Sequence, residues 1–256
     1  MVVSHHYGFI FLHVPKCAGS SLKVSMMPHL GSADLVFGAL DDAIAQGVWP
    51  PRATLMRALR PRSVAWFRKA VTAPLGGRRS LGKALNWAVG RSVREVHGLT
   101  THSVVQACRN AFPLEFQNYA VVAVVRNPWD QFVSRYFWSL RNVPDTEKPP
   151  FKEFVSAIYH GEDRHRGARM REKLPEAFYF YADGTPAVDH PIRFESLESD
   201  WNRFCSTYGL PPRARLTHAK ASARGERGYR EMYNPETREM VAELSKQTIE
   251  VYGHVF

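Results

Sequence analysis

The sequence predicts a three-layer α/β fold in which helices cover both faces of a central parallel sheet. Two apolar runs rich in β-forming residues, GFIFLHV at residues 8–14 and YAVVAVV at 119–125, are each followed by a turn and a helical pattern. Continuous apolar runs of this length are typical of strands buried on both faces, and strands that alternate with helices indicate a parallel sheet. No Gly/Ser- or Pro-rich linker divides the chain, so we expect one domain over residues 1–256.

The other elements follow from local start and stop signals. After the first strand, Pro15 marks a turn and Ser20 is expected to cap a helix. After the second strand, Asn127 can cap and Pro128 can open a helix that reaches about Arg141. Towards the C-terminus the patterns predict a strand at 192–194 and a helix at 197–208 closed by Gly209. They also predict a terminal helix that starts at Asn234-Pro235, carries Val241, Leu244, Thr248 and Val251 on one face, and ends at Gly253.

The net charge of +10 is concentrated in one segment. Residues 51–94 hold eleven Arg or Lys and no Asp or Glu, so the rest of the chain sums to about −1. We expect this segment to form a basic helical insertion. Because Trp66 and Trp87 lie among the basic residues, it could rest on an anionic membrane surface, line a channel for an anionic glycan, or form a solvated pair of lid helices.

Three cysteines, an odd number without CxxC spacing, favour a reduced protein with neither a disulfide framework nor a zinc site. The sequence also shows no signal-peptide pattern and no apolar run long enough to span a bilayer. We therefore expect a bacterial enzyme of the cytoplasm, with peripheral contact at the inner membrane face through residues 51–94 as one interpretation, and no metal.

The turn after the first strand has the composition of a phosphate-binding loop. A strand, a turn of small residues and a helix N-terminus form an anion site from backbone N–H groups and the helix dipole. Gly19 would let the backbone approach a phosphate, and Lys16 adds a positive charge. The loop is not a Walker A motif, because there the lysine directly follows the last glycine, whereas Lys16 precedes Gly19 by three residues. Without a ligand, the same string is a tight βα turn with an exposed lysine.

A second motif follows the second strand. Arg126 stands at the carboxyl end of that strand, where open α/β sheets bind ligands, and Ser134 lies two turns into the next helix. Taken alone, Arg126 could simply form an ion pair and Ser134 could face solvent.

Together, the two motifs resemble the PAPS-dependent sulfotransferases (PAPS is 3′-phosphoadenylyl sulfate), in the carbohydrate branch that has bacterial and Golgi members. The resemblance is carried by FLHVPKCAGSSLK and VVRNPWDQFVSRYFW, and it continues through RFESL, ASAR and the terminal YGHVF. It implies a P-loop-like fold, PAPS as co-substrate, adenosine 3′,5′-bisphosphate (PAP) as product, no metal, and a carbohydrate or glycolipid acceptor. Cys17 and Gln131 depart from the residues common in the family, and residues 30–95 match nothing recognisable.

The resemblance also implies roles for individual residues. The loop would bind the 5′-phosphosulfate through Lys16, Cys17, Ala18, Gly19, Ser20 and Ser21, with Lys16 also stabilising the leaving phosphate. Arg126 and Ser134 would bind the 3′-phosphate, and Arg224 and Tyr229 would contact the nucleotide. A general base would activate the acceptor hydroxyl. His102 fits that role best because it precedes a predicted helix before the second motif, and His97 and Glu95 are the alternatives. His13 would support the loop from its strand.

Two other functions can be weighed against this one. A P-loop nucleotide kinase or NTPase would need the lysine after the glycine and an aspartate for magnesium where Arg126 stands. A polyanion-binding protein without catalysis would agree with a pI near 9.7, but the sequence has no nucleic-acid-binding motif and its charge is confined to one segment. We therefore expect no nucleic-acid partner.

Overall fold

The computed structural model describes residues 1–59, 78–161, 180–211 and 228–256. It divides into two compact units, which are described separately. Unit 1 comprises Met1–Val124 and Tyr179–Ala219, and unit 2 comprises Val125–Phe178 and Lys220–Phe256. Arg224 and Trp66, both singled out in the sequence, lie outside the described residues.

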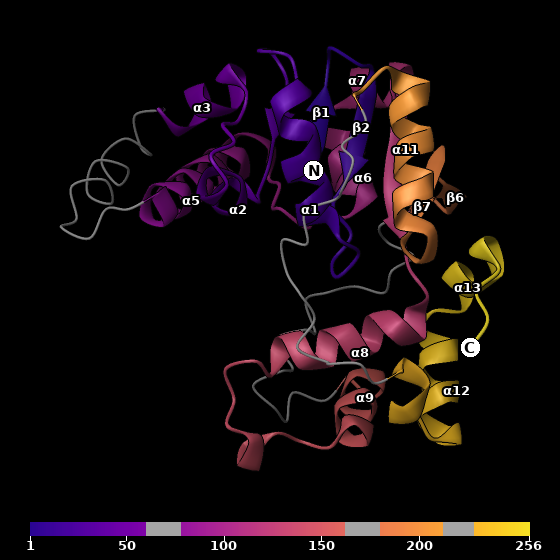
Figure 1. The fold of residues 1–256 in the computed structure, drawn as a ribbon. Coiled ribbons are helices and arrows are strands. Elements are labelled where there is room, and N and C mark those ends of the chain that lie inside the picture. Colours follow the sequence, from indigo (N-terminus) through magenta and orange to yellow (C-terminus); the bar gives the residue numbers. More distant parts are fainter. Residues whose placement is uncertain (60–77, 162–179, 212–227) are drawn as a thin grey trace. The chain divides into compact units, whose positions relative to one another are not determined.

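Unit 1 is built on a five-stranded sheet in the order β3-β1-β2-β4-β7 (Figure 1). Strand β2 is parallel to β4, with Leu12 beside Ala123, and β1 is antiparallel to both β2 and β3. All four side chains of β2 are almost wholly buried, as its apolar run predicted. The α/β class is therefore confirmed, but the sheet is mixed rather than purely parallel. Its strands are β1 (Val2–Ser4), β2 (Phe9–Leu12), β3 (Leu35–Val36), β4 (Ala120–Val125) and β7 (His190–Arg193).

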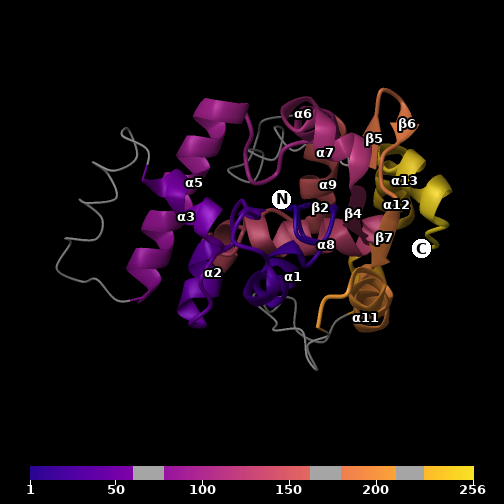
Figure 2. The same ribbon diagram turned by 90° about the horizontal axis from the view of Figure 1, so that it is seen from above.

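Helices cover both faces of this sheet. Figure 2 shows α1 and α11 on one side and α6 and α7 on the other, which gives the expected three layers. A two-stranded sheet, β5 (Tyr181–Ala182) and β6 (Thr185–Pro186), lies beside α6. The helices of unit 1 are α1 (Gly19–Met26), η1 (Met27–His29), α2 (Leu40–Ala45), α3 (Arg52–Ala58), α5 (Arg78–His97), α6 (Val105–Ala111), α7 (Pro113–Asn118), η4 (Phe194–Ser196) and α11 (Leu197–Tyr208).

The basic segment is helical in its described parts, as predicted. It contributes α3 and α5, and α5 packs along both α2 and α3. The close contact with α2 depends on Gly82, because a Cβ there would lie 2.7 Å from the Cα of Asp41. The apolar residues Ala84, Leu85 and Ala88 form part of the buried face of α5, so this helix is part of the core of unit 1.

Unit 2 is helical in its described residues. Its core joins α8 and α9 to the C-terminal helix α12 through Trp129, Phe132, Val133, Phe151, Phe154, Val155 and Val241. Its elements are α8 (Pro128–Ser139), η2 (Asp145–Glu147), α9 (Phe151–Tyr159), η5 (Tyr229–Met232), α12 (Pro235–Leu244) and α13 (Lys246–Tyr252).

Two details of the predicted helices were wrong. The first helix begins at Gly19, with Ala18 as its N-cap residue in the left-handed region at φ 53°, so Ser20 lies in the first turn and does not cap it. The predicted C-terminal helix is two helices, because the helix is interrupted at Ser245, and the four residues expected on one face are divided between them. By contrast, α11 ends at Gly209, which adopts φ 73° as a C-terminal glycine should.

Candidate active site

The loop between β2 and α1 contains two non-glycine residues in the left-handed region of backbone conformation. Lys16 and Ala18 both have positive φ, 65° and 53°, a conformation that costs a non-glycine residue about 1–3 kcal/mol and persists only where the surroundings hold it. No side chain caps the N-terminus of α1. Lys16 and Ser20 are partly exposed, whereas Cys17 is buried and directs its thiol towards the carbonyl of Pro15 at 3.5 Å. The loop therefore presents a cation beside a helix N-terminus, which is an anion-binding arrangement.

Residue 19 has no room for a side chain, because the ring of His13 lies next to its Cα. A Cβ at this position would lie 2.2 Å from Cδ2 and 2.7 Å from Nε2 of His13. His13 is buried, and its Nδ1 lies 2.8 Å from Nζ of Lys23. Lys23 is wholly buried and also donates to the carbonyl of Phe37 at 2.8 Å. Because an ammonium group can only donate, Nδ1 of His13 is the acceptor, and the ring is held over the first residue of α1. His13 thus supports the loop, as expected.

His102 lies against the same strand end. Its Nδ1 is 3.2 Å from the carbonyl oxygen of His13, and the two rings are 4.5 Å apart. A carbonyl accepts only, so Nδ1 must carry the proton, and in the neutral imidazole Nε2 is then the basic nitrogen. The neighbouring Thr101 packs against Gly38, where a Cβ would lie 2.4 Å from Cγ2 of Thr101. The fold therefore holds His102 beside the start of the loop between β2 and α1, with Nδ1 directed at the carbonyl of His13.

The two alternative bases have other partners. Nε2 of His97 accepts a hydrogen bond from Nη1 of Arg57 at 3.0 Å, and its ring packs on Phe112 at 4.9 Å. Because Arg57 donates to Nε2, this nitrogen is engaged in joining α5 to α3. Glu95 lies on the exposed face of α5 and pairs with Arg91 at 2.9 Å. Of the three candidates, His102 is the one bonded to the residue that directly follows β2 and leads into the loop.

The second motif adopts the predicted cap. The side chain of Asn127 accepts from the backbone N–H of Trp129 at 3.1 Å, and Pro128 occupies the first turn of α8. Arg126 is 8% exposed and donates from Nε and Nη2 to Oδ2 of Asp130, at 2.8 and 2.6 Å. Ser134 is partly exposed and lies one turn beyond Asp130 on the same side of α8. The ion pair considered in the sequence therefore exists, and it fixes the guanidinium of Arg126.

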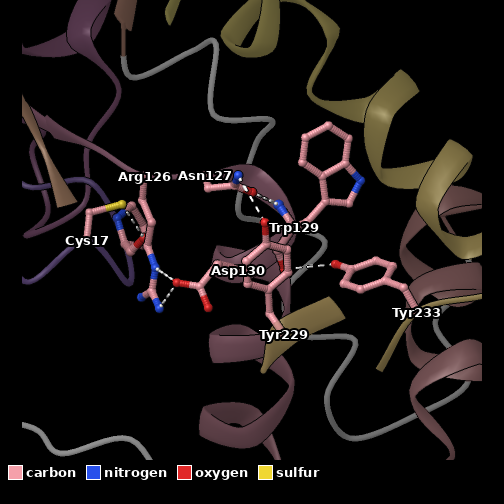
Figure 3. A network of polar contacts seen from close by, with 8 residues as sticks. Cys17, Arg126, Asn127, Trp129, Asp130, Tyr229 and Tyr233 are labelled. Atoms are coloured by element: carbon pink, nitrogen blue, oxygen red, sulfur yellow. Dashed lines mark hydrogen bonds and ion pairs between the residues drawn. The ribbon is translucent and has the colours of Figure 1, made fainter. Parts of the chain in front are cut away.

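A polar network joins the start of α8 to residues 229–256 (Figure 3). Asn127 donates from Nδ2 to the carbonyl of Val255 at 2.8 Å and to the hydroxyl of Tyr229 at 3.4 Å. The hydroxyl of Tyr233 donates to the carbonyl of Trp129 at 2.9 Å. Tyr229 and Arg126 are thus both held by residues at the N-terminal end of α8.

Sequence reasoning missed two of these residues. Lys23 follows the loop in the string SSLK and reads as a solvent-facing helical lysine, and only the fold reveals that it is buried. Asp130 was passed over although its i,i+4 spacing from Arg126 is a recognised signal for an ion pair. The candidate residues fall into two sets. Unit 1 holds the loop and His102, and unit 2 holds Arg126, Ser134 and Tyr229.

Comparison with protein families identifies the class of reaction. The model of the sulfotransferase family matches residues 1–253, nearly the whole chain. The chain belongs to the sulfotransferase family. Comparison with curated proteins and with solved structures gave no significant match. The reaction supported by this membership is sulfuryl transfer to an acceptor substrate.

The described residues of this sulfotransferase hold no cluster of three or more His, Cys, Asp or Glu side chains suited to a metal ion. No helix in the same parts of the chain has both the length and the apolar character needed to cross a bilayer.

Proposed function

We propose that the chain transfers the sulfuryl group of PAPS to a hydroxyl of a carbohydrate or glycolipid and releases PAP. The observation that carries the proposal is the hydrogen bond from His102 to the carbonyl of His13, three residues before Lys16. With Nδ1 bonded to this carbonyl, the neutral ring of His102 has Nε2 as its basic nitrogen, and we assign it as the base that acts beside the loop.

In the proposed reaction, the acceptor oxygen attacks the sulfur of PAPS and the bond from sulfur to the bridging oxygen breaks. The proton of the acceptor hydroxyl passes to Nε2 of His102. The electron pair of the broken bond leaves with the 5′-phosphate, where Lys16 and the N–H groups of Gly19, Ser20 and Ser21 stabilise the new charge. Cys17 and Ala18 contribute backbone to the same loop.

We assign the 3′-phosphate to the motif of unit 2. The guanidinium of Arg126 carries five N–H donors, and its Nε and Nη2 donate to Asp130. These bonds to Asp130 fix the plane of the guanidinium group. A guanidinium group with a fixed plane is suited to bidentate hydrogen bonding with a phosphate. Ser134 supplies a hydroxyl, and Tyr229 and Arg224 complete the proposed nucleotide contacts. The two motifs follow β2 and β4, which are adjacent parallel strands.

The first test measures nucleotide binding by calorimetry in the presence of EDTA. PAP should bind well tighter than AMP, because only PAP carries the 3′-phosphate. Arg126→Ala should remove most of this preference, whereas Arg203→Ala, which removes an exposed arginine of α11, should keep it. Equal affinities of the intact protein for PAP and AMP would refute the assignment of the 3′-phosphate.

The second test addresses the base. His102→Ala should lower kcat by about 10²-fold or more, with PAP affinity nearly unchanged, because general-base catalysis contributes about 10²–10⁴ in rate. The matched variant His97→Ala removes a histidine bonded to Arg57 and should retain most of kcat. Near-normal turnover of His102→Ala would transfer the role to His97 or Glu95.

A further inference from the structure

The exposed faces of α3 and α5 concentrate large apolar side chains. Among the described residues, eight large hydrophobic side chains are exposed, and five of them lie between residues 49 and 96. Surface clusters of this kind mark interaction sites more often than isolated exposed residues do. The five are Trp49 (56% exposed), Met56 (54%), Leu59 (52%), Val96 (43%) and Trp87 (40%).

On α3, the exposed residues follow helical spacing. Arg52, Met56 and Leu59 are separated by four and three residues and are all exposed, so they lie along one side. The opposite side is buried through Thr54 and Ala58. The exposed residues are therefore not needed for the core of unit 1.

Helix α5, like α3, has one buried side and one exposed side. Lys83, Trp87, Arg91 and Arg94 are exposed, and the guanidinium of Arg91 lies 5.5 Å from the ring of Trp87. The two helices pack against each other, and the hydrogen bond between Arg57 and His97 joins them. Figures 1 and 2 both show α3 beside α5. The exposed faces of α3 and α5 thus combine basic and large apolar side chains on neighbouring helices, and we call them the α3/α5 surface.

The chemistry of the α3/α5 surface identifies a partner. Residues 51–94 contain no acidic residue, and the adjoining Glu95 is paired with Arg91, so an anionic partner complements the charge of α3 and α5. An acidic glycan would use the charges but would leave Met56 and Leu59 in water. An anionic bilayer uses both, because headgroups attract the basic residues while aromatic and aliphatic side chains enter the interface.

We propose that the α3/α5 surface binds this protein to the surface of an anionic bilayer. The inference does not depend on the proposed function, since vesicle binding is measured without a donor or an acceptor. If the acceptor is a glycolipid, this contact would bring the enzyme to the membrane that contains it.

Flotation with lipid vesicles tests the proposal. The intact protein should float with vesicles of phosphatidylcholine and phosphatidylglycerol at low salt, release at high salt as screening increases, and ignore pure phosphatidylcholine. Lys83→Ser/Arg94→Ser should bind about 30-fold more weakly, as expected for two basic residues near an anionic surface. The control Arg203→Ser/Lys246→Ser removes two equally charged, exposed residues elsewhere and should bind as the intact protein does.

A second pair of variants tests the apolar contribution. Met56→Ser/Leu59→Ser should weaken binding by at least about tenfold, and the control Leu114→Ser/Val251→Ser, which alters two other exposed apolar residues, should not. Circular dichroism establishes that each variant folds. The proposal is overturned if intact protein does not float with anionic vesicles, or if test and control variants bind alike. If Lys83→Ser/Arg94→Ser loses activity only towards acidic glycans while the intact protein ignores vesicles, the surface serves the acceptor instead.

Discussion

Replacing Gly19 with alanine would drive a methyl group into the ring of His13. The new Cβ would lie 2.2 and 2.7 Å from two ring atoms, and contacts below 3.0 Å are essentially never observed. The ring cannot easily yield, because it is buried and its Nδ1 is bonded to Lys23. Gly19 does not have positive φ, so alanine suits the backbone and only space is lacking. The sequence had attributed this glycine to the approach of a phosphate.

Overpacking of this kind costs about 1–3 kcal/mol, which lowers the melting temperature of a chain of this size by roughly 2–10 °C. Because the first turn of α1 must shift, turnover should also fall by at least about tenfold. Thermal unfolding of Gly19→Ala, His13→Ala and the double variant measures the clash directly. With the ring removed, the added methyl group should cost at least about 1 kcal/mol less than in the intact protein. Additive effects of the two substitutions would refute this reasoning.

The remaining predictions concern unit 1. Gly82→Ala should destabilise the protein by about 1–3 kcal/mol because its Cβ would meet the backbone of Asp41, whereas Gly90→Ala, in the same helix with open space around it, should stabilise by about 0.5–1 kcal/mol. Thermal melts in which both variants shift the same way would contradict this. None of the three cysteines forms a disulfide, and all three are buried. Burial raises the pKa of Cys108 and of Cys205 to about 11, so these two thiols stay protonated at neutral pH. Ellman's reagent should therefore label none of the three rapidly in native protein and all three in denaturant.

Long apolar runs, and residues that mark the start or end of a helix, made much of the fold predictable. The runs at β2 and β4 gave the two parallel strands, and Asn127-Pro128 and Gly209 gave helix ends that the structure reproduces. The antiparallel strands β1 and β3 were missed because they have three and two residues, too few for any periodicity to appear. The start of α1 was misplaced because Ala18 adopts a left-handed conformation that its residue type does not favour.

The candidate site was only partly predictable. The types of residue and their order along the chain indicated the loop, Arg126 and His102 as candidates, because such motifs rarely occur together in one sequence. The sequence ranked His102 above His97 and Glu95 only by its position before a predicted helix, because the hydrogen bonds of the three side chains are formed by the fold. The carbonyl of His13, far away in sequence, sets the protonated nitrogen of His102, and Arg57 engages His97.

The string PKCAGSSLK contains two lysines that a motif search would treat alike, yet the structure separates them completely. Lys16 is partly exposed in the loop, while Lys23 is buried and joins α1 to the side chain of His13, directly after β2, and to the carbonyl of Phe37. Amine-reactive labels should thus distinguish the two without any ligand present. The same division should appear in the evolution of the family. A relative that loses the basic residue at position 23 should also have replaced the histidine at position 13, whereas position 16 should vary independently of both.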